Sequence, residues 1–175
     1  MLFGNRVVLR PWAEVDLPVL SGIRNDLELQ LVLMSEPRPN SEGRVRQWLQ
    51  DRSAQADTVF FVTARAADDH AVGFIQAHRI DRRNGAGYLG ICLARDHQNE
   101  GLGGEAIQLL STYLVEVMGL RKLMLEVLSD NQGAINFYLR AGFAVVGSLR
   151  AHHLMRGRFH DVIIMEKMLW QEKTL

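Results

Sequence analysis

The chain is 175 residues long, with 20 basic and 20 acidic side chains, and 47% apolar and 23% charged residues, a profile typical of one globular domain over residues 1–175. Zero net charge without a Lys/Arg cluster argues against a nucleic-acid partner, and no apolar run approaches the roughly 20 residues that cross a membrane. The start carries no secretion-signal pattern and the single Cys92 allows no internal disulfide, so we expect a cytoplasmic protein with Cys92 as a small core residue.

The first part of the chain predicts one strand and two helices. A β-rich strand over Arg6–Trp12 is stopped by Pro11. Asp16 is placed to cap a helix over Leu17–Asn25, and Ser41 is placed to cap a second helix with apolar residues at helical spacing.

The middle of the chain predicts an antiparallel meander. The dipeptide Asn84-Gly85 is a strong hairpin signal between two of the strands. The predicted strands are Thr58–Ala66, Ala71–Ile80 and Ala86–Ala94.

The second half predicts alternating helices and strands. A loop and helix over His97–Val117 precede a strand at Lys122–Leu128, a helix at Asn131–Gly142 and two last strands beginning at Phe143 and Phe159. This order favours parallel pairing through helical crossovers. We therefore predict an α/β (α+β) fold, with a mixed, largely antiparallel central sheet of about seven strands and about four helices.

Three glycines, Gly101, Gly103 and Gly104, stand where this loop turns into its helix. A helix start offers unpaired N–H groups and a partial positive charge, and glycines let a phosphate approach the backbone. The spacing is neither that of a dinucleotide site nor that of a Walker loop. From the glycines alone, a diphosphate site and an ordinary glycine-rich turn remain equal alternatives.

Two motifs resemble the GNAT superfamily of acyl-CoA N-acyltransferases. The run "QNEGLG", from Gln98 to Gly103, is similar to the superfamily's pyrophosphate loop, [R/Q]-x-x-G-x-[G/A]. The segment Leu125–Phe143 is similar to its L-E-V-x-x-x-N-x-x-A-I-x-x-Y-x-x-x-G-F segment. The resemblance is nearest to the broad branch of ribosomal-protein, polyamine and amino-sugar N-acetyltransferases, and implies the GNAT fold.

The resemblance implies acetyl transfer from acetyl-CoA directly to a primary amine, with acetyl-CoA as co-substrate, no metal and no covalent enzyme intermediate. The diphosphate is expected on the backbone of Gln98, Asn99, Glu100, Gly101, Leu102, Gly103 and Gly104. The rest of the coenzyme is expected along Ile91, Cys92, Leu93, Asn131, Ala134 and Tyr138.

Tyr138 matches the superfamily's tyrosine near the coenzyme sulfur, which implies a general acid; the alternative is an aromatic residue packed in the core. Glu126 is the expected base, because a carboxylate in an apolar strand is either costly or in use, and burial would raise its pKa. The alternatives are a partly open face or an Arg partner for Glu126, and a relay through Tyr88, which stands where many relatives carry Glu. His78 and His97 are interpreted as surface histidines.

The acceptor side is less clearly marked. Arg24, Asn25 and Asp26 form a sequence that is similar to one in relatives acting on nucleotide-linked amino sugars and, less regularly, in the branch of ribosomal-protein and polyamine acetyltransferases. Helix-end polarity explains this sequence equally well. The expected acceptor is a small-molecule amine such as an amino sugar or a nucleotide-linked amino sugar. The alternatives are a protein N-terminus, a polyamine or an antibiotic amine, or a non-catalytic acyl-CoA sensor. A homodimer is expected by analogy only.

Overall fold

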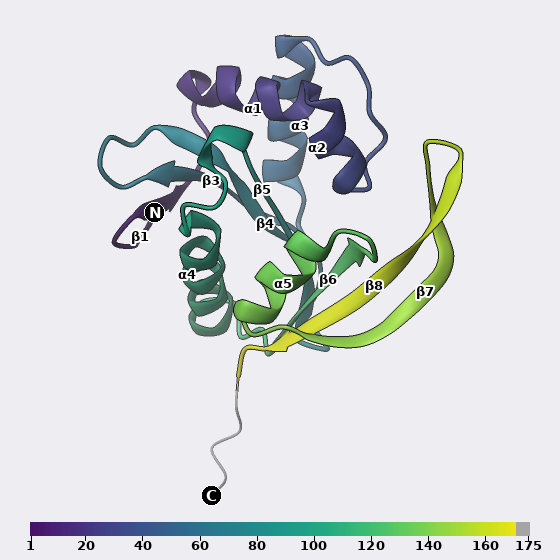
Figure 1. The fold of residues 1–175 in the computed structure, drawn as a ribbon. Coiled ribbons are helices and arrows are strands. Elements are labelled where there is room, and N and C mark those ends of the chain that lie inside the picture. The colour runs from purple at the N-terminus through teal and green to yellow at the C-terminus, as the bar shows by residue number, and fades with distance from the viewer. Residues whose placement is uncertain (171–175) are drawn as a thin grey trace, which may run out of the picture.

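A computed structural model describes residues 1–170 of the chain. Its framework is one eight-stranded sheet in the order β1-β2-β3-β4-β5-β6-β8-β7 (Figure 1). The strands are β1 (Leu2–Phe3), β2 (Val7–Arg10), β3 (Val59–Arg65), β4 (Ala71–Asp81), β5 (Ala86–Leu93), β6 (Lys122–Leu128), β7 (Ala144–Met155) and β8 (Arg158–Met168). The α-helices are α1 (Leu17–Asn25), α2 (Leu27–Val32), α3 (Glu42–Ala54), α4 (Leu102–Glu116) and α5 (Gln132–Arg140).

The predicted meander is confirmed. Strands β3, β4 and β5 pair antiparallel in sequence order, and β2 pairs antiparallel with β3. The Asn84-Gly85 turn joins β4 to β5, with Gly85 at a φ of 61°, a left-handed conformation that suits glycine. The predicted parallel crossover is also present, because β5 pairs parallel with β6 after the chain has passed through α4.

The second predicted crossover is only partly correct. The chain leaves β6 through α5, but β7 does not pair with β6. Strand β8 lies between them and pairs antiparallel with both, from Leu128↔Val162 on one side and Ala144↔Glu166 on the other. Because β7 and β8 form one long hairpin, the returning strand takes the inner position and β7 becomes the edge of the sheet (Figure 1).

Helices cover the two faces of the sheet and create two cores. On one face, α4 and α5 bury residues such as Leu110 and Ile135 against the strands. On the other face, α1 and α3 bury Leu20 and Leu49 against Phe60 and Phe74. The alternation of side chains along each strand therefore divides the sheet into an α4/α5 face and an α1/α3 face.

Strand β1 and helix α2 were not predicted, and one predicted cap has a different role. Both β1 and α2 are too short to show a periodic pattern. Asp16 precedes α1 as expected, but its carboxylate makes no cap hydrogen bond to that helix. It instead accepts hydrogen bonds from the buried Arg10 guanidinium, at 2.7 and 2.9 Å. The Ser41 cap is confirmed, since its hydroxyl accepts from the N–H of Arg44.

Candidate active site

A cleft opens where two neighbouring strands separate. The β5–β6 ladder runs from Ala86↔Lys122 to Tyr88↔Met124, and the described chain contains no further pair between the two strands. Strand β5 then continues to Leu93, paired only with β4. The resulting cleft has a volume of about 1220 Å³ and reaches both faces of the sheet, since residues from α1, α3, α4 and α5 line it.

The glycine turn forms one end of this cleft and presents free amides. Within residues 1–170, no backbone N–H from Asn99 to Gly104 donates to a protein acceptor. Gln98 differs, because its N–H donates to the carbonyl of Arg95 at 3.2 Å. The diphosphate was expected on the backbone of Gln98 to Gly104, and the backbone amides of all of these residues except Gln98 are available.

Backbone conformation concentrates these amides. Asn99 has a φ of 64° and Gly101, the residue before α4, a φ of 78°. Left-handed residues in such a loop turn successive N–H groups toward one side and create an anion-binding concavity. The first turn of α4 adds the positive end of its dipole at the same place. The geometry therefore fits a diphosphate, which is the group that acetyl-CoA would present there.

Side chains from outside the turn hold it in place. The guanidinium of Arg6 donates to the carbonyl of Glu100, and the N–H of Arg6 donates to the carboxylate of Glu105 at 3.0 Å. The side-chain amide of Gln98 donates to the carbonyl of Leu93 at 3.0 Å. Glu100 does not line the cleft, so its side chain is not part of the predicted site.

The predicted coenzyme-contacting residues of β5 line the cleft, but their side chains point to different faces of the sheet. Ile91 and Leu93 pack against the α4/α5 core, whereas Cys92 is buried in the α1/α3 core. Burial raises the pKa of the Cys92 thiol to about 12, so Cys92 is a neutral core thiol, as the sequence indicated. Any contact of Cys92 with the coenzyme would come from its backbone.

Asn131 and Ala134 begin α5 at the opposite wall. The Asn131 Oδ1 atom accepts from the N–H of Ala134 at 3.1 Å and caps the helix. The side-chain NH₂ group of Asn131 makes no hydrogen bond within residues 1–170 and can donate into the cleft.

Tyr138 lies one helical turn further along α5 and is half-buried. Its ring packs between Phe137 and Phe143, with centroid distances of 5.2 and 5.8 Å. Burial raises the pKa of Tyr138 to about 12. No group among the described residues hydrogen-bonds its hydroxyl, which leaves the O–H free to donate into the cleft.

The two candidate bases, Glu126 and Tyr88, lie where β5 and β6 separate, on the α1/α3 face of the sheet. The predicted burial of Glu126 is wrong: its side chain is 35% exposed, because Leu125 and Val127 take the core-facing positions of β6. Its carboxylate lies 3.9 Å from Arg79, so both alternatives considered for it, an open face and an Arg partner, are realised. Tyr88 stacks beneath the same guanidinium at 4.3 Å.

His78 also belongs to this group, contrary to its interpretation as a surface residue. It pairs across the strands with Tyr88, at a ring distance of 6.1 Å, and lines the cleft. Burial, together with the positive charges of Arg52 and Arg79, lowers the pKa of His78. The imidazole is therefore neutral at neutral pH and able to accept a proton.

Of the three predicted substrate-binding residues, Arg24, Asn25 and Asp26, only Arg24 lines the cleft. Asn25 instead ties the chain together, donating to the carbonyl of Asn40 and accepting from its N–H. Asp26 caps α2 and pairs with Arg95, which lowers the pKa of Asp26 to about 2. Two of the three residues thus have the structural role that was the alternative interpretation.

Other cleft residues were not found from the sequence. They come from separate elements that meet only in the fold: Trp48, Arg52, Phe74, Gln76 and Arg79. None stands in a motif, and the only signal was the apolar spacing that predicted Trp48 as a buried helix residue. The described residues contain no group of three or more His, Cys, Asp or Glu arranged to hold a metal, and no helix long and apolar enough to span a membrane.

Three features of this cleft are typical of an acyl-CoA-dependent N-acetyltransferase. They are two parallel strands that separate, free amides at a helix start, and a tyrosine that lines the same cleft. The family model described as "Acetyltransferase (GNAT) domain" matches residues 6–144. The chain belongs to this family and is an acetyl-CoA-dependent N-acetyltransferase, as the resemblance implied.

Named relatives cover almost the whole chain. The uncharacterized N-acetyltransferase p20 of Bacillus licheniformis is 27% identical over 163 residues, 92% of each chain. Spermidine N(1)-acetyltransferase of Escherichia coli (strain K12) is 25% identical over 162 residues, 93% of this chain and 86% of the relative. The crystal structure of spermidine N-acetyltransferase from Vibrio cholerae in complex with CoA and spermine has a TM-score of 0.86 at 22% identity, covering 95% of this chain and 97% of that one, which shows the shared fold.

Proposed function

We propose that the protein transfers the acetyl group of acetyl-CoA to the primary amine of a small molecule, with Tyr138 as general acid and Glu126 as general base. One observation carries the proposal: the free amides from Asn99 to Gly104 lie at one end of a cleft whose other walls hold Tyr138 and Glu126. A diphosphate on these amides directs the attached arm along the unpaired side of β5.

The acid role of Tyr138 rests on a comparison of its pKa with that of the leaving thiol. A tyrosine with a pKa of about 12 is protonated throughout the neutral range. The leaving thiolate has the basicity of an ordinary thiol, with a pKa of about 8.5, and needs a proton as the thioester bond breaks. Tyr138 donates this proton from an aromatic pocket where no described protein group competes for its hydroxyl.

The base role rests on position. A primary amine is mostly protonated at neutral pH and must lose a proton before it attacks the thioester. Glu126 and Tyr88 face the acceptor side where the strands part, and Arg79 lies beside both. Glu126 accepts the proton directly or through a water molecule; a relay through Tyr88 remains the alternative.

Two acceptor classes follow from different observations. The Arg24-Asn25-Asp26 sequence suggested an amino sugar or a nucleotide-linked amino sugar, but only Arg24 lines the cleft. Relatives named spermidine acetyltransferases support a polyamine as the second candidate, in preference to a specific amino sugar. A protein N-terminus and an antibiotic amine have no supporting contact among the described residues.

The test measures release of free thiol from acetyl-CoA in the presence of a panel of amines. We expect amine-dependent thiol release and a stoichiometric acetylated product by mass spectrometry. Binding of acetyl-CoA without thiol release on any amine would replace the proposal by the sensor alternative. Failure to bind acetyl-CoA at all would contradict both.

A further inference from the structure

The acceptor half of the cleft contains two guanidinium groups without a carboxylate partner. Arg24 donates to the neutral Oε1 of Gln30 at 2.8 Å. Arg52, from the last turn of α3, donates to the neutral Oε1 of Gln55 at 3.4 Å. Within residues 1–170 neither side chain forms an ion pair, although both line the cleft.

Both arginines are half-buried, and Trp48 relates them: Arg24 stacks on its ring, and Arg52 follows it by one turn of α3. The pKa of Arg24 is lowered by burial and by the positive charges of Arg52 and Arg44. The Nε of Arg24 is buried and has no hydrogen-bond partner, and its guanidinium stacks over the Trp48 ring at 4.9 Å. A half-buried guanidinium without an anion, with one buried N–H group unpaired, is unfavourable, so the arrangement favours a bound counter-charge.

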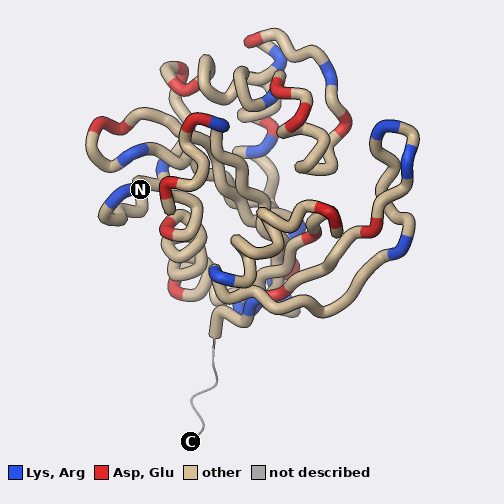
Figure 2. The backbone as a smooth tube through the Cα atoms, viewed as in Figure 1, with Lys and Arg blue, Asp and Glu red and all other residues tan. Residues whose placement is uncertain are grey.

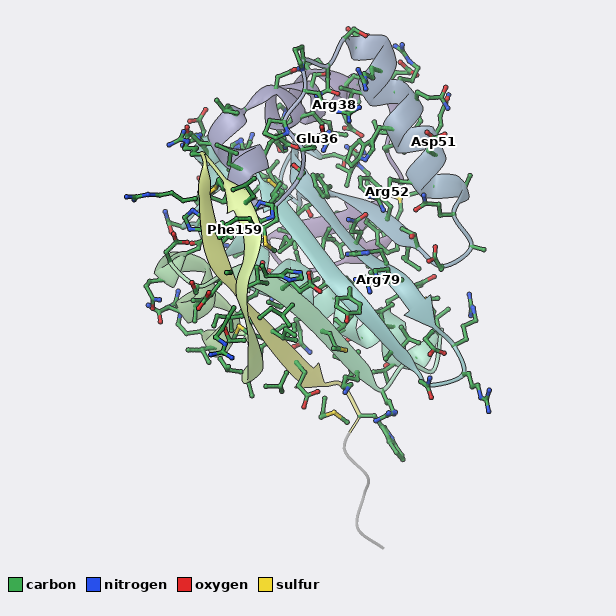
Figure 3. The ribbon with its side chains drawn as sticks, turned by 90° about the vertical axis from the view of Figure 1, so that its right-hand side faces the viewer. Glu36, Arg38, Asp51, Arg52, Arg79 and Phe159 are labelled. Carbon is green, nitrogen blue, oxygen red and sulfur yellow. The ribbon has the colours of Figure 1, made fainter. Side chains whose placement is uncertain are left out.

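The carboxylates of the cleft do not supply that counter-charge. Glu28 pairs with Arg156 of the β7–β8 hairpin, and Glu126 lies nearest to Arg79. Figure 3 shows Arg52, at the end of α3, and Arg79, on β4, on the same side of the sheet. Although acidic and basic positions are mixed over the molecule as a whole (Figure 2), the acceptor half of the cleft has a surplus of positive charge.

A buried amide gives a second, independent sign of a ligand. Gln76 is 8% exposed and lines the cleft, and its Oε1 atom has no hydrogen-bond partner in the described chain. Unpartnered buried acceptors are rare in folded proteins and cost free energy. The N–H or O–H group of a bound acceptor molecule would satisfy this oxygen.

We propose that Arg24 and Arg52 form an anion site, so that the acceptor is an amine that also carries a carboxylate or phosphate group. The inference rests on the proposed function and specifies its substrate class. Planar guanidinium groups bind both anions through paired N–H donors. A polycation meets repulsion at the same place, which disfavours the polyamine candidate.

This site is separate from the place expected for the coenzyme diphosphate. The amide-rich turn begins α4, which packs on the α4/α5 face of the sheet. Trp48, on which Arg24 stacks, packs against the α1/α3 core together with Phe74. The anion site and the amide-rich turn therefore face the cleft from opposite faces of the sheet.

The first test compares matched amines that differ in one charged group. The pairs are γ-aminobutyrate against putrescine, and glucosamine phosphate against glucosamine. We expect kcat/KM to be at least about tenfold higher for the anionic member of a pair, the effect of one charge-assisted interaction. Higher values for putrescine and glucosamine would overturn the anion site while leaving the acetyltransferase proposal intact.

The second test uses Arg52→Gln and Arg24→Lys, with Arg83→Gln as the matched control. Arg83 is exposed in the β4–β5 turn and does not line the cleft. Both cleft variants should raise KM for the anionic amine by about tenfold and leave KM for acetyl-CoA unchanged. Arg24→Lys keeps the charge but loses the planar fork, so a fold defect from lost charge is avoided. Equal KM values for the anionic amine in wild type and Arg52→Gln would contradict the inference.

A third test needs no turnover. Inorganic phosphate is titrated by calorimetry into protein saturated with CoA, so that the coenzyme phosphate positions are occupied. We expect binding that Arg52→Gln weakens by about tenfold and Arg83→Gln does not change. Binding without thiol release on any amine would contradict the proposed function alone, whereas binding that is absent or unaffected by Arg52→Gln would overturn the anion site.

Discussion

The phenol of Tyr138 combines a raised pKa with a free hydroxyl. A pKa of about 12 means that the acid form is present at every pH at which the enzyme would work. Activity that needs this proton is therefore retained as pH rises and is lost only as pH passes through about 12. In the role proposed for Tyr138, the same burial that raises the pKa would also limit access of bulk water to the leaving thiolate.

Tyr138→Phe tests this role with the ring retained. We expect kcat to fall by about 10²–10⁴-fold, the usual contribution of a general acid, with the affinity for acetyl-CoA unchanged. Because the hydroxyl has no protein partner, the melting temperature should also be unchanged. A wild-type kcat in this variant would remove Tyr138 from the mechanism and return it to the packing role that was its alternative.

Glu126→Gln tests the base. A carboxylate base acts only when deprotonated, so the wild-type rate should fall on the acid side of its pH profile, and the variant should lose this limb. The rate of thiol release, measured over a range of pH, gives the pH–rate profiles of the wild type and the variant. The comparison variant is His78→Gln, since burial lowers the pKa of His78 and leaves it neutral near pH 7. If Glu126→Gln keeps the wild-type profile and His78→Gln loses the limb, the base is His78.

At the scale of elements, the turn before α4 depends on close approach of backbone and ligand. A Cβ at Gly103 would lie 3.1 Å from the Phe137 ring, and a β-branched side chain would extend into the cleft. We expect Gly103→Val to weaken acetyl-CoA binding by at least about 100-fold, through lost amide contacts worth several charge-assisted hydrogen bonds. The control is Gly43→Ala in α3, where a Cβ meets nothing within 4 Å. Unchanged affinity in Gly103→Val would refute the diphosphate assignment of the turn.

Elements with a local signal could be predicted from the sequence. The meander followed from β-branched runs and the Asn84-Gly85 turn, and α4 followed from glycines before an apolar repeat. The insertion of β8 between β6 and β7 could not be predicted, because hairpin length and strand order are not encoded in local periodicity. Helix α2 was missed because six residues are too few for a periodic pattern.

The same distinction applies to the site. The proposed coenzyme side is built from two continuous segments, so their motifs predicted Gly101, Asn131 and Tyr138 as contacts of one ligand, and all three line the cleft. The proposed acceptor side is assembled from a few residues of α1, α3, β4 and β6, and no spacing in the sequence joins Arg52 to Gln76. The sequence left the burial of Glu126 open for a related reason: an apolar strand does not reveal which of its alternating faces opens into a cleft.

At the scale of the whole molecule, one sheet lies between two separate cores. A buried ion pair between Arg10 and Asp16 lies near the edge of the sheet that is formed by β1 and β2. Arg10, on β2, is 6% exposed and Asp16 is 1% exposed. The hydrogen bonds from Arg10 to Asp16 raise the pKa of Arg10 further above its usual range. Because Asp16 also accepts from the N–H of Ala13 at 2.8 Å, this pair fixes the entry into α1 and thereby the α1/α3 layer that carries Arg24.

Asp16→Asn should therefore destabilise the fold more strongly than any surface charge change. Removing one partner of a buried pair costs about 3–5 kcal/mol, and we expect about 3 kcal/mol because Arg10 keeps its contact with Asp69 at 2.7 Å. Urea unfolding followed by circular dichroism measures the change.

The double variant Arg10→Met/Asp16→Asn should be less destabilised than Asp16→Asn alone, since no buried charge is left unpaired. Glu14→Gln, which breaks an exposed pair with Arg46, is the control and should show no measurable change. If Asp16→Asn unfolds at the wild-type urea concentration, the pair does not anchor the α1/α3 layer, and the position of Arg24 must depend on the apolar contacts of Leu20 and Leu49 alone.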